Sequence, residues 1–152
     1  MLTPEPPSVD RPWLADTFAV VRLLRDEQAY AQWEDMPAPR LVAICPITEL
    51  EILYSARSPA DRADLLDELG EVFGWLAVPD RAYERALAVQ AELTAHGRHR
   101  APGPVDLLVA ATADLHGVTL LHYDRDFDQI TNVSGQATQW LAEPGALDRP
   151  KG

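Results

Sequence analysis

Short runs of apolar residues alternate along the chain with longer segments whose apolar positions recur at helical spacing. Short, continuous apolar runs between turn-forming residues are typical of buried strands. They predict strands at residues 13–15, 41–45, 75–78, 118–121 and 137–141. The segments between them predict helices at residues 17–27, 46–56, 59–73, 79–94 and 105–116, with shorter helices at 30–35 and 124–130. This alternation predicts an α/β fold, a single domain with a mainly parallel five-stranded sheet flanked by helices.

Local signals mark several ends of the predicted helices. Pro46 fits the first turn of the helix after the second strand, and Ser58 precedes the start of the next one. The helix at 105–116 is apolar nearly all round, so we expect it to be buried, and Gly117 ends it. We expect residues 1–12 to form a flexible leader, residues 13–141 the folded domain and residues 142–152 a tail.

Composition narrows the class of protein. The 152 residues suit one domain, and 47% hydrophobic residues indicate a folded globule. The single cysteine, Cys45, excludes a disulfide framework and a cysteine-type zinc site. There is no apolar run of membrane-spanning length, and the start of the chain lacks the features of a signal peptide. We therefore expect a soluble cytoplasmic protein with no membrane partner.

The charge balance excludes one mode of nucleic-acid binding. The formal net charge is −11, whereas a protein that binds only by neutralising phosphates should be basic. If this chain handles a nucleic acid, bound cations or a local basic patch must supply the attraction.

Acidic residues fall near the carboxyl ends of the predicted strands, where parallel sheets bind their ligands. Asp16 follows the first strand, Glu49 lies in the first turn after the second, and Asp124 follows the fourth, with Asp126 close behind. Asp106 opens the apolar helix before that fourth strand. Carboxylates brought together at one edge repel each other unless a cation relieves them. Mg²⁺ or Mn²⁺ prefers oxygen ligands, and such an ion polarises a phosphate and activates a water.

Each acid also has an ordinary structural explanation. Asp16 and Asp106 could cap helices, Glu49 could serve a helix dipole, and the acids from Asp124 onward could form a solvated turn. Glu51 competes with Glu49, because the two lie about 200° apart on a helix and cannot point at one spot. The helical pattern does not choose between them. The coincidence of all the acidic positions favours a site.

Four segments together resemble the PIN-domain ribonucleases, specifically the VapC-type toxins of bacterial toxin–antitoxin pairs. The segments are Leu14-Ala15-Asp16-Thr17, Ile47-Thr48-Glu49-Leu50, residues 104–113 and residues 121–127. Each is short, and their order and spacing carry the resemblance, which covers residues 13 to 141.

The resemblance implies a parallel five-stranded sheet and an endoribonuclease that needs Mg²⁺ or Mn²⁺. It also implies an RNA substrate, homodimerisation and a cognate antitoxin that blocks the site. Carried over by position, the catalytic acids are Asp16, Glu49, Asp106 and Asp124, with Asp126 a possible fifth. We expect Asp16, Asp106 and Asp124 to be metal ligands and Glu49 to orient a water or bind the cation.

The chain departs from the family at His122, where Thr or Ser is common. His122 is either a phosphate contact for RNA or an ordinary histidine at a strand end. A loop with Arg98 and Arg100 precedes Asp106. We name both arginines as candidates for contact with the RNA backbone, against the alternative of a solvated loop.

Other classes of protein remain open at this point. Haloacid-dehalogenase-like phosphatases and response-regulator receivers also carry Asp at strand ends with Mg²⁺, but both need a lysine in the domain. Lys151, in the predicted tail, is the only lysine here. A catalytically idle PIN-like domain that acts through protein partners is the other alternative.

Overall fold

Every strand of the central sheet runs parallel to its neighbours. A computed structural model describes residues 4–26 and 40–148. Its strands are β1 (Trp13–Ala15), β2 (Val42–Ile44), β3 (Gly74–Trp75), β4 (Leu120–His122) and β5 (Thr138–Trp140). They form one sheet in the order β3-β2-β1-β4-β5. This confirms the predicted α/β fold with its five-stranded parallel sheet.

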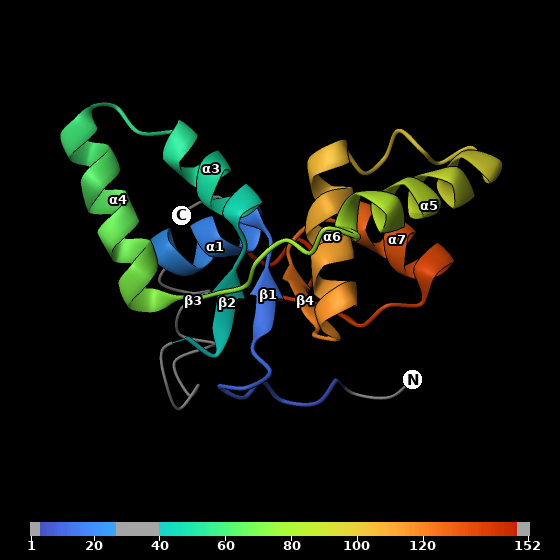
Figure 1. The fold of residues 1–152 in the computed structure, drawn as a ribbon, viewed down its shortest axis with the longest axis horizontal. Helices are drawn as coiled ribbons and strands as arrows, with labels where there is room; N and C mark the ends of the chain where they lie inside the picture. Colours follow the sequence, from blue (N-terminus) through green and yellow to red (C-terminus); the bar gives the residue numbers. More distant parts are fainter. Residues whose placement is uncertain (1–3, 27–39, 149–152) are drawn as a thin grey trace.

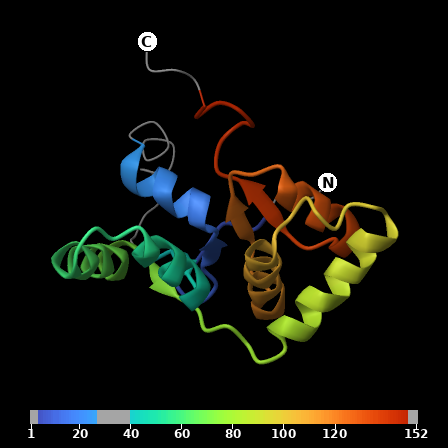
Figure 2. The ribbon, with the colours of Figure 1, turned by 90° about the horizontal axis from the view of Figure 1, so that it is seen from above.

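Helices cover both faces of the sheet. The described helices are α1 (Thr17–Arg25), α3 (Pro46–Tyr54), α4 (Pro59–Val72), α5 (Ala82–Ala95), α6 (Pro104–His116) and α7 (Asp126–Ser134). Helices α1, α3 and α4 lie on one side of the strands, and α5, α6 and α7 lie on the other (Figures 1 and 2). The short helix predicted at residues 30–35 lies outside the described residues.

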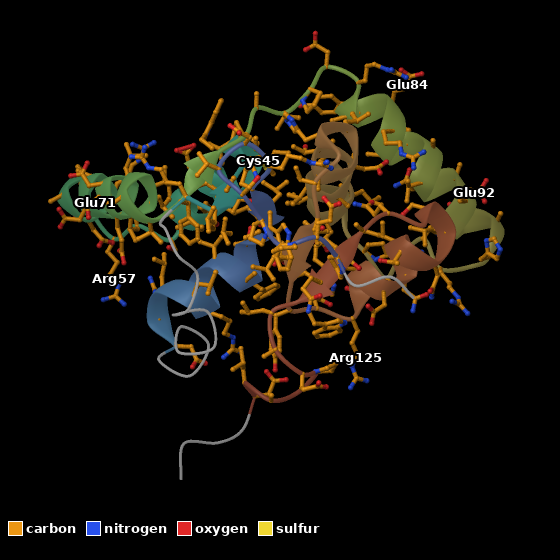
Figure 3. All side chains as sticks on the ribbon, turned by 90° about the horizontal axis from the view of Figure 1, so that it is seen from below. Cys45, Arg57, Glu71, Glu84, Glu92 and Arg125 are labelled. Atoms are coloured by element: carbon orange, nitrogen blue, oxygen red, sulfur yellow. The ribbon has the colours of Figure 1, made fainter. Side chains whose placement is uncertain are left out.

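The alternation of side chains along each strand builds two apolar cores. In β1, Leu14 packs with α5, α6 and α7, whereas Trp13 and Ala15 pack with α1, α3 and α4. The expected burial of α6 is confirmed, because most of its residues from Leu107 to Ala113 are buried. Cys45, at the end of β2, is fully buried near the centre of the molecule, while the labelled charged residues lie around its periphery (Figure 3).

The predicted helix ends are confirmed where a cap defines them. The hydroxyl of Ser58 accepts a hydrogen bond from the N–H of Asp61 at 3.0 Å, and Pro59 follows as the first residue of α4. Gly117 ends α6 in a left-handed conformation, with φ of 67°. A residue with a β-carbon would be strained there.

Several predicted elements have different bounds in the structure. Predicted strand 75–78 is the two-residue edge strand β3. Predicted strand 118–121 begins at Leu120 and ends at His122, so His122 belongs to β4. The apolar stripe of α4 is only partly covered: Leu69 is buried, whereas Leu66 is 39% exposed. Helix α4 packs on α3 at the end of the molecule, where little lies beyond it (Figure 1).

Segments beyond the predicted domain boundaries contact the domain. In the leader, the backbone carbonyl of Glu5 accepts a hydrogen bond from the Trp13 indole N–H at 3.0 Å. In the tail, the buried Leu147 donates its N–H to the Tyr123 hydroxyl at 2.8 Å. The boundaries at 13 and 141 stay predictions. Among the described helices, none combines the length and apolar character that crossing a membrane requires.

Candidate active site

Asp16 stands between β1 and α1 with its carboxylate inside the protein. Its Oδ1 accepts a hydrogen bond from the N–H of Ala19 at 3.0 Å, so it caps α1. The residue is only 3% exposed. Burial raises the pKa of Asp16 to about 7; the Ala19 hydrogen bond opposes this rise, and the charges of Asp106 and Asp124 add to it. A nearby cation would therefore be needed to keep this carboxylate fully ionised at neutral pH.

Asp106 lies in the first turn of α6, beyond the carboxyl edge of the sheet. Its Oδ2 accepts a hydrogen bond from the N–H of Gly103 at 3.2 Å. Burial raises the pKa of Asp106, the Gly103 hydrogen bond lowers it, and the charges of Asp124, Asp126 and Glu51 raise it again. The acids that act on Asp106 thus come from two other parts of the sequence, α3 and the segment after β4.

Asp124 follows β4, and Asp126 and Asp128 lie in the first turn of α7. Asp124 Oδ1 accepts a hydrogen bond from the N–H of Asp126 at 2.9 Å. Burial and the charge of Asp124 raise the pKa of Asp126. The third acid of this segment, Asp128, instead accepts a hydrogen bond from the Trp140 indole at 3.2 Å.

The two glutamates of α3 point to different neighbours. Glu49 Oε2 accepts a hydrogen bond from the Trp75 indole at 3.1 Å, on the side of the edge strand β3. Glu51 Oε1 accepts one from the Thr17 hydroxyl at 2.6 Å, next to Asp16. Glu51 is also the glutamate whose charge acts on Asp106. The structure thus brings Glu51 to the aspartates and turns Glu49 toward Trp75, whereas the family resemblance was carried over to Glu49.

The donor set of this site fits a hard divalent cation. Within residues 4–26 and 40–148, no three His, Cys, Asp or Glu side chains already stand in a metal-binding arrangement. Mg²⁺ keeps several waters and takes one or two carboxylates directly, so it does not need such a cage. Asp16, Asp106 and Asp124 offer only oxygen atoms, and the mutual charge effects on the first two are of the kind that a cation relieves.

His122 is not placed to contact RNA. Its side chain is fully buried in β4, and its ring packs between Phe127, at 5.1 Å between ring centroids, and Trp140, at 4.9 Å. Burial lowers the pKa of His122 to about 4, although the charges of Asp128 and Asp124 oppose this. The ring is therefore neutral at pH 7, and the predicted phosphate contact is not supported.

The basic loop before α6 is exposed and tied to α7. Arg98 donates a hydrogen bond from Nη1 to Gln129 Oε1 at 2.9 Å, and Arg100 is exposed two residues further along. Gln129 lies one helical turn from Asp126. The proposed role of Arg98 and Arg100 toward RNA stays a prediction.

Comparison with known proteins identifies the family of this chain. The PIN domain family model matches residues 14–133. The chain belongs to the PIN-domain family. Within this family it groups with the VapC ribonucleases. Ribonuclease VapC2 of Mycobacterium tuberculosis is 38% identical over 133 residues, which cover 87% of this chain and 94% of that protein. Ribonuclease VapC51 of the same species is 37% identical over 136 residues, which cover 90% of this chain and 97% of that protein.

Solved structures of VapC-containing complexes share the fold. VapBC2 from Rickettsia felis, bound to a promoter DNA fragment, matches with a TM-score of 0.67 and 16% identity, covering 84% of this chain and 97% of that one. VapBC-1 from nontypeable Haemophilus influenzae matches with a TM-score of 0.68 and 19% identity, covering 85% of this chain and 97% of that one. Membership of the VapC group replaces the phosphatase and receiver alternatives. PIN-domain VapC ribonucleases generally depend on a divalent metal, in agreement with the oxygen donors found here.

The order of the strands explains why the helical pattern of this VapC protein could not choose between the two glutamates. Thr48 and Ile52 form the buried face of α3, and Glu49 and Glu51 lie on its two flanks. Because β2 lies between β3 and β1, one flank faces Trp75 and the other faces Thr17. Only the position of β1 beside β2 selects Glu51.

Proposed function

We propose that this chain is the ribonuclease toxin of a toxin–antitoxin pair and that its active site is the acid cluster at the carboxyl edge of β1 and β4. Asp16, Asp106 and Asp124 would hold the cation, Mg²⁺ or Mn²⁺, and Glu51 would be the fourth acid in place of Glu49. The observation that carries this proposal is the placement of these acids: they come from separate segments and lie beyond the carboxyl ends of β1 and β4, with Glu51 bonded to Thr17 beside Asp16. The raised pKa values of Asp16 and Asp106 agree with this placement.

Each residue would have a separate role in the endonucleolytic hydrolysis of an RNA phosphodiester bond. When bound, the cation supplies charge that polarises the phosphate and favours ionisation of a water. Glu51 has one oxygen fixed by Thr17, which leaves the other to orient the attacking water. As the water oxygen bonds to phosphorus, it gives one proton to the free oxygen of Glu51. The ester P–O bond breaks, and the leaving oxygen takes a proton from solvent. Asp126 lies beside Asp124 and would bind a metal-bound water.

The two glutamates provide a matched test. Glu51→Gln and Glu49→Gln each remove one negative charge from α3 while keeping the shape of the side chain. We expect Glu51→Gln to lower Mn²⁺-dependent cleavage of a fluorescent RNA roughly a hundredfold or more. We expect Glu49→Gln to stay close to wild type, because Glu49 faces Trp75. Loss of activity only in Glu49→Gln would restore the assignment made from the sequence.

An antitoxin is the proposed protein partner. The solved neighbours are VapBC complexes, in which a chain of this fold is paired with a second protein. A pocket of carboxylates is a receptor for an arginine side chain, whose fork binds carboxylates bidentately. We infer that the antitoxin blocks the site in this way. The proposed RNA substrate places the activity in the cytoplasm.

A second copy of the chain is the other proposed partner. Helix α3 exposes Leu50 and Tyr54, and α5 exposes Tyr83 and Leu87, each pair one helical turn apart. Tyr54 is 91% exposed. Paired large apolar side chains on a surface indicate a protein interface. A homodimer through α3 and α5 would cover them, and light scattering of the purified chain measures its mass in solution.

A further inference from the structure

His122 is a buried polar residue that the proposed mechanism leaves without a task. It is the last residue of β4 and lies two positions before Asp124. Its ring fills the space between Phe127 of α7 and Trp140 of β5. An apolar ring would fill this space equally well, so packing alone does not explain a histidine.

The nitrogen atoms of the ring indicate a more specific task. His122 Nδ1 accepts a hydrogen bond from the backbone N–H of Asp124 at 3.3 Å. Asp124 in turn accepts one from the N–H of Asp126 at 2.9 Å. These two bonds link the buried end of β4 to both acids of the turn. They fix the backbone from which the Asp124 carboxylate projects.

The other ring nitrogen of His122, Nε2, is in a destabilising position. Since Nδ1 accepts, the neutral ring carries its proton on Nε2, and Nε2 is buried with no hydrogen-bond partner among the described residues. A buried donor left unpaired is destabilising. A purely space-filling residue would avoid that penalty, so the hydrogen bond made by Nδ1 is the gain that distinguishes histidine from phenylalanine here.

We propose that His122 is a positioning residue of the active site, which acts by holding the backbone of Asp124 so that its carboxylate faces Asp16 and Asp106. The inference rests on the proposed function, because Asp124 matters through the cation that it would hold. It differs from an RNA contact, since the side chain of His122 is fully buried.

Substitutions of His122 that keep either an aromatic ring or a hydrogen-bond acceptor, but not both, test this proposal. His122→Phe keeps a ring between Phe127 and Trp140 but has no acceptor. His122→Asn loses the ring, but its Oδ1 is bonded to Cγ as Nδ1 is, so it can accept from Asp124. His122→Gln is the control amide, because its oxygen lies one bond further out, near the place of Nε2.

The readouts are the Mn²⁺ dissociation constant of the RNA-free protein, measured by calorimetry, and the thermal unfolding midpoint with chelator. We expect His122→Phe to bind Mn²⁺ about 10 to 100 times more weakly than wild type, as is usual when a residue that orients a metal ligand is lost. Its unfolding midpoint should be equal or higher. His122→Asn should bind more tightly than both His122→Phe and His122→Gln, despite a lower midpoint.

Wild-type affinity in His122→Phe would overturn the positioning role, as would equal losses in the Asn and Gln variants. If His122→Asn does not fold, the comparison of His122→Phe with wild type still decides. Failure of the proposed function looks different, because the wild-type protein itself would then bind no Mn²⁺.

Discussion

Each of the three aspartates proposed as metal ligands also has a backbone hydrogen bond at one oxygen. Ala19 donates to Asp16, Gly103 donates to Asp106, and the third acid, Asp124, receives its bond inside its own turn. Capping and metal binding are therefore compatible uses of one carboxylate, since each leaves a second oxygen available. At the residue scale, an acid that starts a helix cannot be assigned to either use from sequence alone, because both uses favour the same position.

The buried carboxylate of Asp16 predicts a pH-dependent stability of the metal-free protein. Its pKa is raised to about 7 in the fold, so between its ordinary value and about 7 the folded state holds a proton that the unfolded state has lost. Stability conferred at low pH is then lost as pH rises through this window. We expect the free energy of unfolding of Asp16→Asn, relative to that of wild type, to increase as the pH is raised from 5 to 8. Urea unfolding in the presence of a chelator measures this difference.

Asp16→Ala is the control for the capping part of this effect. Asparagine keeps an oxygen for the Ala19 N–H, whereas alanine loses it, at a cost of about 1 kcal/mol. The alanine variant should show the same pH trend as the asparagine variant, displaced to lower stability. A stability difference between wild type and Asp16→Asn that is independent of pH would contradict the raised pKa.

At the scale of elements, the sequence predicts where strands and helices lie better than how they face one another. Short strand-like segments, most of them apolar runs, located all five strands, and capping residues such as Ser58 located helix starts, because these signals are local. The flank of α3 that faces the acid cluster depends on β1 lying beside β2. The partial exposure of α4 depends on its place at the end of the molecule (Figure 1). Neither arrangement can be predicted from a local sequence pattern.

The exposed loop between α5 and α6 carries the prediction for RNA binding. Arg98 and Arg100 lie in the segment that leads to Asp106, and Arg98 is anchored to α7. Each phosphate contact that is lost should lower RNA affinity and reduce its salt slope by about one unit. We expect the double variant Arg98→Ala with Arg100→Ala to show both effects, measured by fluorescence anisotropy at saturating Mn²⁺ with Glu51→Gln present to slow cleavage, because Glu51 is not among the proposed metal ligands.

Two arginines elsewhere provide the charge-matched control. Arg57 and Arg62 are exposed at the start of α4, and Figure 3 shows Arg57 at the edge of the molecule on the α4 side. Replacing both with alanine changes the net charge equally. If the two double variants weaken RNA binding to the same extent, long-range charge rather than the loop is responsible.

At the scale of the whole molecule, a net charge of −11 sets an acidic protein against a polyanionic substrate. Long-range attraction to RNA is unfavourable, so binding must depend on local positive charge and on the cation. The same acidity suits a partner that brings arginine to the site. The cation and the antitoxin are thus expected to compete for the same carboxylates.

This competition is measurable with the purified cognate antitoxin. We expect Mn²⁺ to weaken its binding, because the cation occupies the carboxylates that an arginine would contact. Asp16→Ala should weaken antitoxin binding and reduce its sensitivity to Mn²⁺. An antitoxin affinity that is indifferent to both changes would place the contact elsewhere on the toxin.

The most direct measurement of the central claim is RNA cleavage by wild type and Asp106→Asn across a Mn²⁺ or Mg²⁺ titration. Asp106→Asn keeps an oxygen that can accept from Gly103 and removes one charge from the cluster, so the fold should remain, with equal or higher stability. The account predicts cleavage by wild type only with the cation, and a loss of about a hundredfold or more in the variant, beyond the effect of residues that merely orient a ligand. Unchanged metal-dependent cleavage by Asp106→Asn would contradict it.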